Sequence, residues 1–141
     1  MAAEAKTKAT GENVSDYIEK IESTVLRADA VELAGLFARL CGEPARMWGP
    51  SIIGFGSYDY TYDSGHTGTS MRIGFAARKS GLVIYIVPGF GEFSRELAEI
   101  GPHTTSKSCL NLKNLQKTDM AALESLAKKA LAMMDARYPR A

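Results

Sequence analysis

Hydrophobic residues recur at helical spacing near both ends of the chain. Apolar residues three or four positions apart follow Asn13, a good helix-capping residue, and predict a helix over residues 14–27. A second apolar stripe follows Asp29, which has a glutamate three positions later as in a capping box, and ends before Gly42. A third stripe predicts a long C-terminal helix capped by Thr118.

The middle of the chain alternates instead with a period of two, which is typical of antiparallel strands. Residues 52–55 predict a short strand, the tyrosines of residues 58–62 share one face of a second, and residues 71–78 form a third. Residues 82–87 are apolar on both faces, as in a central strand. A last short strand is predicted over residues 108–112.

Prolines, glycines and polar residues predict the connections. Trp48 lies between two prolines, which favours a loop. Residues 63–68 have the composition of a turn, and a short helix over residues 93–100 stops at a Gly-Pro pair. Residues 103–107 are polar and predict an exposed loop.

The order of these elements indicates an α+β fold. About five antiparallel strands would carry helices on one face, with the N- and C-terminal helices flanking the sheet. Residues 1–12 are small and charged and predict a flexible tail, whereas residues 13–141 contain no linker or repeat and predict one domain. An unpaired edge strand leaves both a monomer and a homodimer open.

Composition and charge argue against several classes of protein, namely membrane, secreted and nucleic-acid-binding proteins. No apolar run is long enough to cross a bilayer, and the N-terminus has no apolar segment like that of a secretory signal. Cys41 and Cys109 lie in apolar patterns and predict buried free thiols, so we expect a cytoplasmic protein with no membrane partner. A net charge of +1 disfavours nucleic-acid binding, for which the candidate contacts are Arg72, Arg78, Lys79, Lys113 and Lys117.

Aromatic and basic residues supply a candidate site for a planar or anionic small ligand. The alternative is that the tyrosines pack under the helices, with their hydroxyl groups at the rim. The candidate ligand-binding residues are Trp48, Tyr58, Tyr60, Tyr62, Arg78 and Lys107.

Several stretches resemble the YdhG-like family, a domain of unknown function with the number 1801. The resemblance rests on residues 48–58, with Trp-Gly-Pro followed by Gly-Phe-Gly, and on the Tyr-Asp-Ser-Gly of residues 62–65. Residues 74–79, 97–101 and 107–110 agree with it. The resemblance implies a twisted antiparallel sheet, a distant likeness to frataxin-type iron chaperones, and no established catalytic residues.

That likeness suggests an acidic ridge as an iron site. Glu12, Asp16, Glu19 and Glu22 recur at helical spacing, and carboxylate oxygens suit weakly held iron. The candidate metal ligands are therefore Asp16, Glu19 and Glu22, and the alternative is a solvated helix face.

The sequence contains no convincing catalytic constellation. Cys109 and His103, or Ser64 and His66, lack a positioned third group, and the Lys107-Ser108 segment lacks the second glycine and the following helix of a phosphate loop. The sequence thus predicts a non-catalytic binding module for a small ligand, a partner protein or weakly held iron. The alternative is a small-molecule enzyme with a pocket between the Tyr58–Tyr62 strand and the Lys107 loop.

Overall fold

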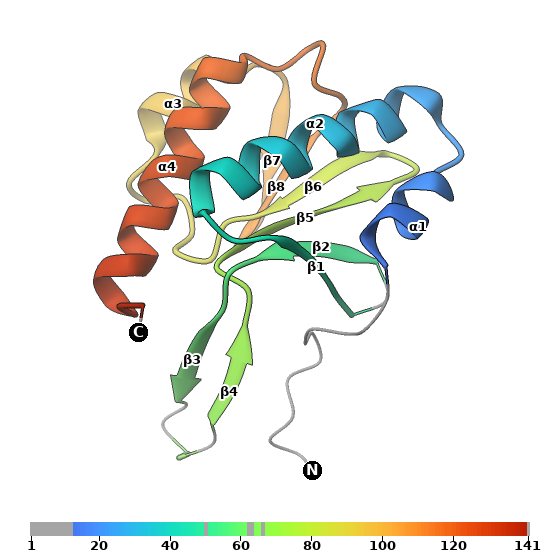
Figure 1. The fold of residues 1–141 in the computed structure, drawn as a ribbon. Helices are drawn as coiled ribbons and strands as arrows, with labels where there is room; N and C mark the ends of the chain where they lie inside the picture. The colour runs from blue at the N-terminus through green and yellow to red at the C-terminus, as the bar shows by residue number, and fades with distance from the viewer. Residues whose placement is uncertain (1–12, 50, 62–63, 66, 141) are drawn as a thin grey trace.

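The computed structural model describes residues 13–49, 51–61, 64–65 and 67–140, and it confirms the α+β class (Figure 1). The helices are α1 (Val14–Glu19), α2 (Thr24–Cys41), α3 (Ser94–Glu99) and α4 (Met120–Arg137). The strands are β1 (Ala45–Trp48), β2 (Ile52–Phe55), β3 (Tyr58–Thr61), β4 (Thr67–Ser70), β5 (Ile73–Arg78), β6 (Gly81–Tyr85), β7 (His103–Thr105) and β8 (Cys109–Leu112).

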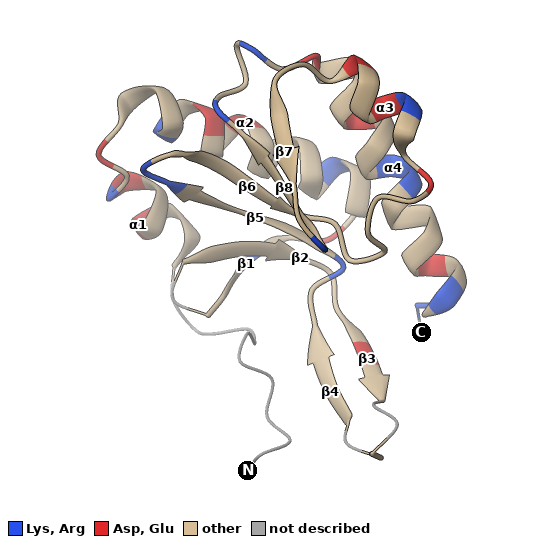
Figure 2. Cartoon of the chain, turned by 180° about the vertical axis from the view of Figure 1, so that it is seen from behind, with Lys and Arg blue, Asp and Glu red and all other residues tan. Residues whose placement is uncertain are grey.

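Six strands form one antiparallel sheet in the order β1-β2-β5-β6-β8-β7, so the apolar strand β6 is central as predicted. Helices α2 and α4 cover one face of this sheet, and no helix of the described residues lies on the opposite face (Figures 1 and 2). The strands β3 and β4 pair only with each other and project from the sheet as a separate hairpin (Figure 1). In place of the predicted single sheet of about five strands, the structure has a sheet of six strands and a separate two-stranded hairpin.

The apolar residues of alternate strand positions meet the helices in one core. Phe37 of α2 contacts Phe55 and Phe75 edge to face, with ring centroids 5.9 and 6.0 Å apart. These three rings are fully buried, as are Ile84 of β6 and Leu126 of α4. Burying such side chains is the main stabilising contribution to a fold of this size.

The helix predicted over residues 14–27 is wrong, because the chain breaks between α1 and α2. Ser23 caps α2 by accepting a hydrogen bond from the backbone N–H of Leu26 at 3.2 Å. The Arg27 guanidinium holds the break by donating to the Ile21 carbonyl oxygen at 2.7 and 3.0 Å. Asp29 is not a cap: it is buried inside α2 and accepts from the Leu115 N–H at 3.1 Å.

The other helix ends follow ordinary capping rules. Gly42 ends α2 in the left-handed conformation, at φ 76°, as predicted. Asp119, rather than the predicted Thr118, caps α4 by accepting from the Ala122 N–H at 2.9 Å. Thr118 instead donates through its hydroxyl to the Asn114 carbonyl oxygen at 2.8 Å.

Trp48 and residues 103–107 also differ from the prediction. Trp48 ends β1, and only 1% of its surface is exposed. The flanking prolines do not exclude a four-residue edge strand, since β1 lies between them. Residues His103–Thr105 form the other edge strand, β7, against β8. Both cysteines are free, as expected, but Cys109 is only half-buried.

The buried carboxylate of Glu96 ties α3 to α4. Its Oε2 accepts from the Lys129 ammonium and from the Ser125 hydroxyl, and only 3% of the residue is exposed. The hydrogen bond from Lys129, together with one from the backbone, outweighs burial and holds the pKa of Glu96 below its ordinary value of 4.5. This interaction stabilises the fold only while Glu96 is ionised.

We expect Lys129→Met to remove stability at neutral pH and progressively less at acidic pH. Because the folded-state pKa of Glu96 is lowered, its contribution is complete above the unfolded-state pKa and is lost as the pH falls through the folded-state pKa. Urea unfolding at pH 7 and at steps down to about pH 3 measures the difference between the two proteins. Lys128→Met is the matched control; a difference that stays constant with pH would contradict the prediction.

No helix in the part of the chain that the structure describes has the length and apolar character needed to cross a membrane.

Candidate functional site

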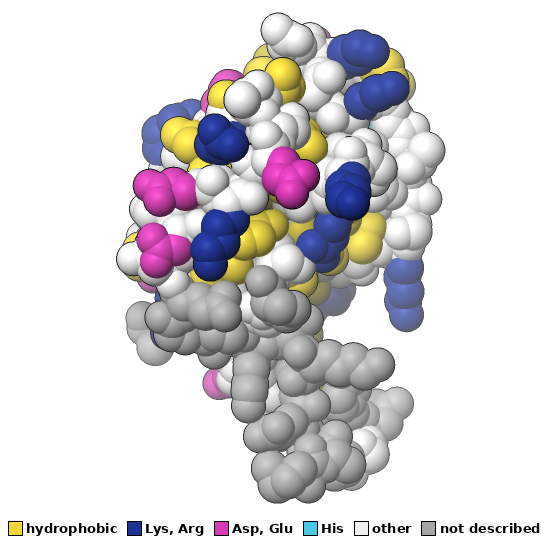
Figure 3. Space-filling model, turned by 90° about the vertical axis from the view of Figure 1, so that its right-hand side faces the viewer, with side chains coloured by type: hydrophobic (Ala, Val, Ile, Leu, Met, Phe, Trp, Pro, Cys, Tyr) yellow, Lys and Arg dark blue, Asp and Glu magenta, His cyan; other side chains and the backbone are white. Residues whose placement is uncertain are grey.

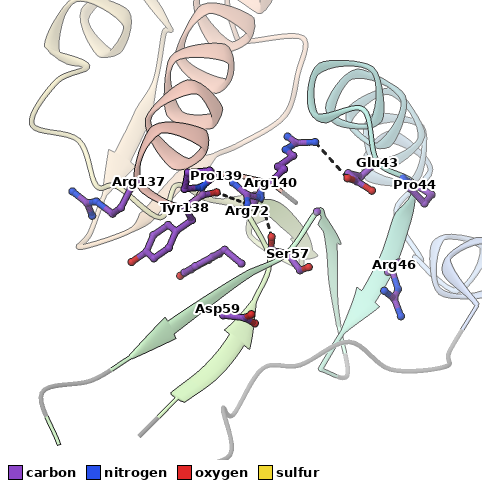
Figure 4. A pocket seen from close by; sticks show the side chains of 12 residues that line it. Glu43, Pro44, Arg46, Ser57, Asp59, Arg72, Arg137, Tyr138, Pro139 and Arg140 are labelled. Carbon is purple, nitrogen blue, oxygen red and sulfur yellow. Dashed lines mark hydrogen bonds and ion pairs between the residues drawn. The ribbon is translucent and has the colours of Figure 1, made fainter. Parts of the chain in front are cut away.

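A cleft of about 660 Å³ lies where the β3–β4 hairpin leaves the sheet (Figure 4). We call it the hairpin cleft. Its walls come from the base of the hairpin, from the segment that enters β1 and from the C-terminal end of α4. Four arginines line it, namely Arg46, Arg72, Arg137 and Arg140, together with Tyr58 and Tyr138 and the carboxylates of Glu43 and Asp59.

Local backbone geometry places the hairpin over this cleft. Gly56 has φ 66°, a conformation that favours glycine, and turns the chain out of β2. A side chain there would also come within 3.0 Å of the Cys41 sulfur. The chain returns when the Arg72 N–H donates to the Phe55 carbonyl oxygen at 3.1 Å, just before β5.

The Arg72 side chain fastens the end of α4 to the base of the hairpin. Only 4% of the residue is exposed. Its guanidinium donates to the Ser57 carbonyl oxygen at 2.8 Å, to Asp135 Oδ1 at 2.9 Å and to the Tyr138 carbonyl oxygen at 2.6 Å. The charge is therefore paired and hydrogen-bonded, as a buried guanidinium must be.

Arg140 extends this network to the end of α2. It shares Asp135 Oδ1 with Arg72, at 3.1 Å, and donates to the Cys41 carbonyl oxygen at 2.6 Å. It also lies 3.4 Å from Glu43 Oε2, and this ion pair appears in Figure 4. Arg72, Asp135 and Arg140, called here the arginine latch, thus hold the C-terminal segment in place.

The latch does not make Cys41 a reactive thiol. Burial raises the pKa of Cys41 above its ordinary value of 9.0, more than the neighbouring charge of Arg140 lowers it. The thiol therefore stays protonated at neutral pH, which is unfavourable for nucleophilic chemistry.

Arg46 and Arg137 differ from the two latch arginines. Both are exposed, and their guanidinium groups form no hydrogen bond or ion pair with any residue the structure describes. They lie on opposite sides of the hairpin base, Arg46 on β1 and Arg137 at the end of α4 (Figure 4). Together, the cleft and the latch contain four guanidinium groups and three carboxylates, those of Glu43, Asp59 and Asp135.

Two tyrosines give this cleft an aromatic wall. The rings of Tyr58 and Tyr138 have centroids 4.5 Å apart and planes inclined by 38°. Both residues are half-buried. An aromatic ring beside guanidinium groups can take a planar ring and an anionic group at once.

The structure does not gather the sequence-predicted ligand residues into one site. Tyr58 lines the hairpin cleft, and Tyr60 lies further along β3 with its ring against Gly68. Trp48 is buried on the helix-free face, against Gly54 and Met71. Tyr62 lies outside the described residues.

The two predicted basic residues lie at opposite ends of the sheet. Arg78 is opposite Gly81 at the β5–β6 turn and donates to the Ser51 hydroxyl at 2.6 Å. Lys107 is exposed and precedes β8, whose first residue Cys109 is opposite Tyr85 at the far end of β6. The cleft lined by Tyr58 does not include Lys107.

Sequence reasoning missed most of the residues that do line the cleft. Arg72 alternates with apolar residues in the predicted strand of residues 71–78, but the sequence marks it only as a candidate nucleic-acid contact. Tyr138 and Arg140 come from the end of the chain, 66 and 68 residues after Arg72 in the numbering, and no spacing rule connects them.

The acidic ridge is interrupted by the helix break. Asp16 and Glu19 are exposed on α1, whereas Glu22 lies beyond its end; Glu12 is outside the described residues. Across the described residues, no three or more His, Cys, Asp or Glu side chains lie close enough together to hold a metal ion. The candidate nucleic-acid contact Arg72 is committed to the latch.

Comparisons with protein-family models, with curated proteins and with solved structures each gave no significant match to this chain.

Proposed function

We propose that this chain is a non-catalytic binding module whose hairpin cleft holds a small molecule with a planar ring and an anionic group. The observation that carries the proposal is the pair of exposed guanidinium groups, Arg46 and Arg137, that have no partner among the described residues. A carboxylate or phosphate would satisfy such groups through charged hydrogen bonds. A ring bound in the same cleft would lie against Tyr58 or Tyr138.

The lining of the cleft favours binding over catalysis. Its described residues include no histidine and no cysteine, which are the commonest bases and activated thiols. Glu43 is paired with Arg140, and Asp59 accepts a hydrogen bond from the Thr69 hydroxyl at 2.7 Å. The enzyme alternative, with a pocket between the Tyr58–Tyr62 strand and the Lys107 loop, is the weaker proposal because Lys107 does not line the hairpin cleft that Tyr58 lines.

We also propose three properties that the sequence predicts. They are membership of the YdhG-like family, a cytoplasmic location and weak binding of iron. The α+β architecture is compatible with the family, but many unrelated families share such an architecture. Calorimetric titration with ferrous and ferric iron tests the last of these predictions. If the triple change of Asp16, Glu19 and Glu22 to alanine leaves any iron binding unaltered, the acidic-ridge site is refuted.

We expect phenyl phosphate, used as a probe, to bind the hairpin cleft, and the double substitution Arg46→Ala and Arg137→Ala to weaken it at least roughly tenfold. Exposed ion pairs contribute up to about 1 kcal/mol each, so the loss of both contacts together reaches this size. Isothermal titration calorimetry measures the affinity, with inorganic phosphate and phenol as probes that each lack one half of the proposed ligand.

Two controls decide the result. Arg95→Ala removes an exposed arginine from α3, outside the cleft, and should bind the probe like the unsubstituted protein. Unfolding curves of all variants check that the fold is intact. Absence of saturable binding to the unsubstituted protein, or equal weakening in Arg95→Ala, would contradict the proposal.

A further inference from the structure

A second cleft, of about 410 Å³, lies between α1 and the β5–β6 turn. We call it the α1 cleft. Its inner surface is formed by Tyr17, Ile21, Leu26 and Ala77, of which Leu26 is buried and the others are half-buried. Figure 3 shows this side, where apolar side chains lie between basic ones. The cleft shares no lining residue with the hairpin cleft.

Hydrogen bonds fix the walls of this cleft. The Ala77 N–H donates to the Tyr17 hydroxyl oxygen at 3.4 Å, which joins α1 to β5. The Arg27 guanidinium holds the Ile21 carbonyl oxygen at 2.7 and 3.0 Å, and Ser23 caps α2. The helix break described above therefore shapes the cleft, and little reorganisation is needed before a ligand enters.

Basic side chains dominate the rim. Lys20, Arg78 and Lys79 line the cleft against one carboxylate, Glu22. The ammonium groups of Lys20 and Lys79 are exposed and pair with no residue that the structure describes. Arg78 uses one nitrogen for the Ser51 hydroxyl at 2.6 Å. A rim with three cations and one anion complements a negatively charged group.

We infer that the α1 cleft binds a small amphiphilic anion, with its carboxylate or phosphate at the rim and a short apolar chain over Ile21 and Leu26. Apolar contacts alone would also accept a neutral chain, but the excess of basic rim residues selects an anionic head group. The volume of the cleft is within the range of small-ligand sites in proteins. This site is independent of the hairpin cleft.

Decanoate and decyl phosphate are the test ligands, with acetate as the head group alone and 1-decanol as the neutral chain. Amide chemical shifts in nuclear magnetic resonance titrations give both affinity and location. We expect saturable shifts at Ile21 and Ala77 with both ten-carbon anions, and affinities at least roughly tenfold weaker for acetate and 1-decanol. A difference between the carboxylate and the phosphate identifies the preferred head group.

The double substitution Lys20→Ala and Lys79→Ala should weaken decanoate binding by roughly fivefold to tenfold, a modest effect because both lysines are exposed. The matched control, Lys107→Ala with Lys128→Ala, removes two exposed lysines elsewhere and should leave binding unchanged. Equal binding of 1-decanol, equal weakening in the control, shifts centred on Tyr58 and Tyr138, or no saturable binding would each overturn the inference.

Discussion

Replacing Arg72 with methionine is expected to lower the free energy of unfolding by about 2–4 kcal/mol. The substitution removes a buried guanidinium and leaves the Ser57 and Tyr138 carbonyl oxygens without their donor. Asp135 also loses one of its two arginine partners, but its side chain is 46% exposed, which reduces the cost. An effect of this size is a large fraction of the stability of an ordinary domain.

Urea unfolding measures this loss, and Arg78→Met is its control. Arg78 is half-buried and donates one side-chain hydrogen bond, to Ser51, so we expect it to cost about 1 kcal/mol or less. The Arg72 variant should also lose phenyl phosphate binding, because the latch positions Tyr138 beside Tyr58. If the two variants unfold at the same urea concentration, Arg72 does not fasten the C-terminal segment.

The elements that the sequence predicted well are those with a local cause. Strand alternation, the position of β6 and the C-terminal helix depend on side-chain periodicity within one segment, and the structure confirms them. The break between α1 and α2 was not predicted, because the apolar spacing continues across it. The break is held by the Arg27 side chain, which donates a hydrogen bond to the Ile21 carbonyl oxygen. The spacing of apolar residues gives no information about a hydrogen bond between a side chain and the backbone.

The candidate site could not be predicted in the same way, because its contacts join distant parts of the chain. Arg72 meets Asp135 and Tyr138, which are 63 and 66 residues later. Tyr58 was predicted as a site residue from its aromatic strand, and it does line the hairpin cleft. Trp48 was predicted for the same reason, but its ring is used in packing.

The Trp48 ring packs on the helix-free face of the sheet, where it lies against Gly54. A Cβ atom on Gly54 would come within 2.5 Å of Trp48 Cδ1 and 2.7 Å of Met71 Sδ. Gly54 is paired with Gly74 of β5, where a Cβ would also lie 2.5 Å from Met71 Sδ. Two opposed glycines therefore make room for one indole and one thioether, which explains the pairing of Trp48 with a glycine at position 54 as a packing requirement.

We expect Trp48→Ala to cost about 3–5 kcal/mol, because it empties a fully buried position. Gly54→Ala should cost about 1–3 kcal/mol through overpacking. Removing the indole relieves two of the three closest contacts of a Cβ at position 54 and leaves only the flexible Met71 side chain to shift, so Gly54→Ala should cost less in the Trp48→Ala protein than in the unsubstituted one. The four proteins of this cycle are compared by urea unfolding, with Gly91→Ala, where no atom lies within 4 Å of the added Cβ, as the neutral control. Additive costs would mean that Trp48 and Gly54 do not share this space.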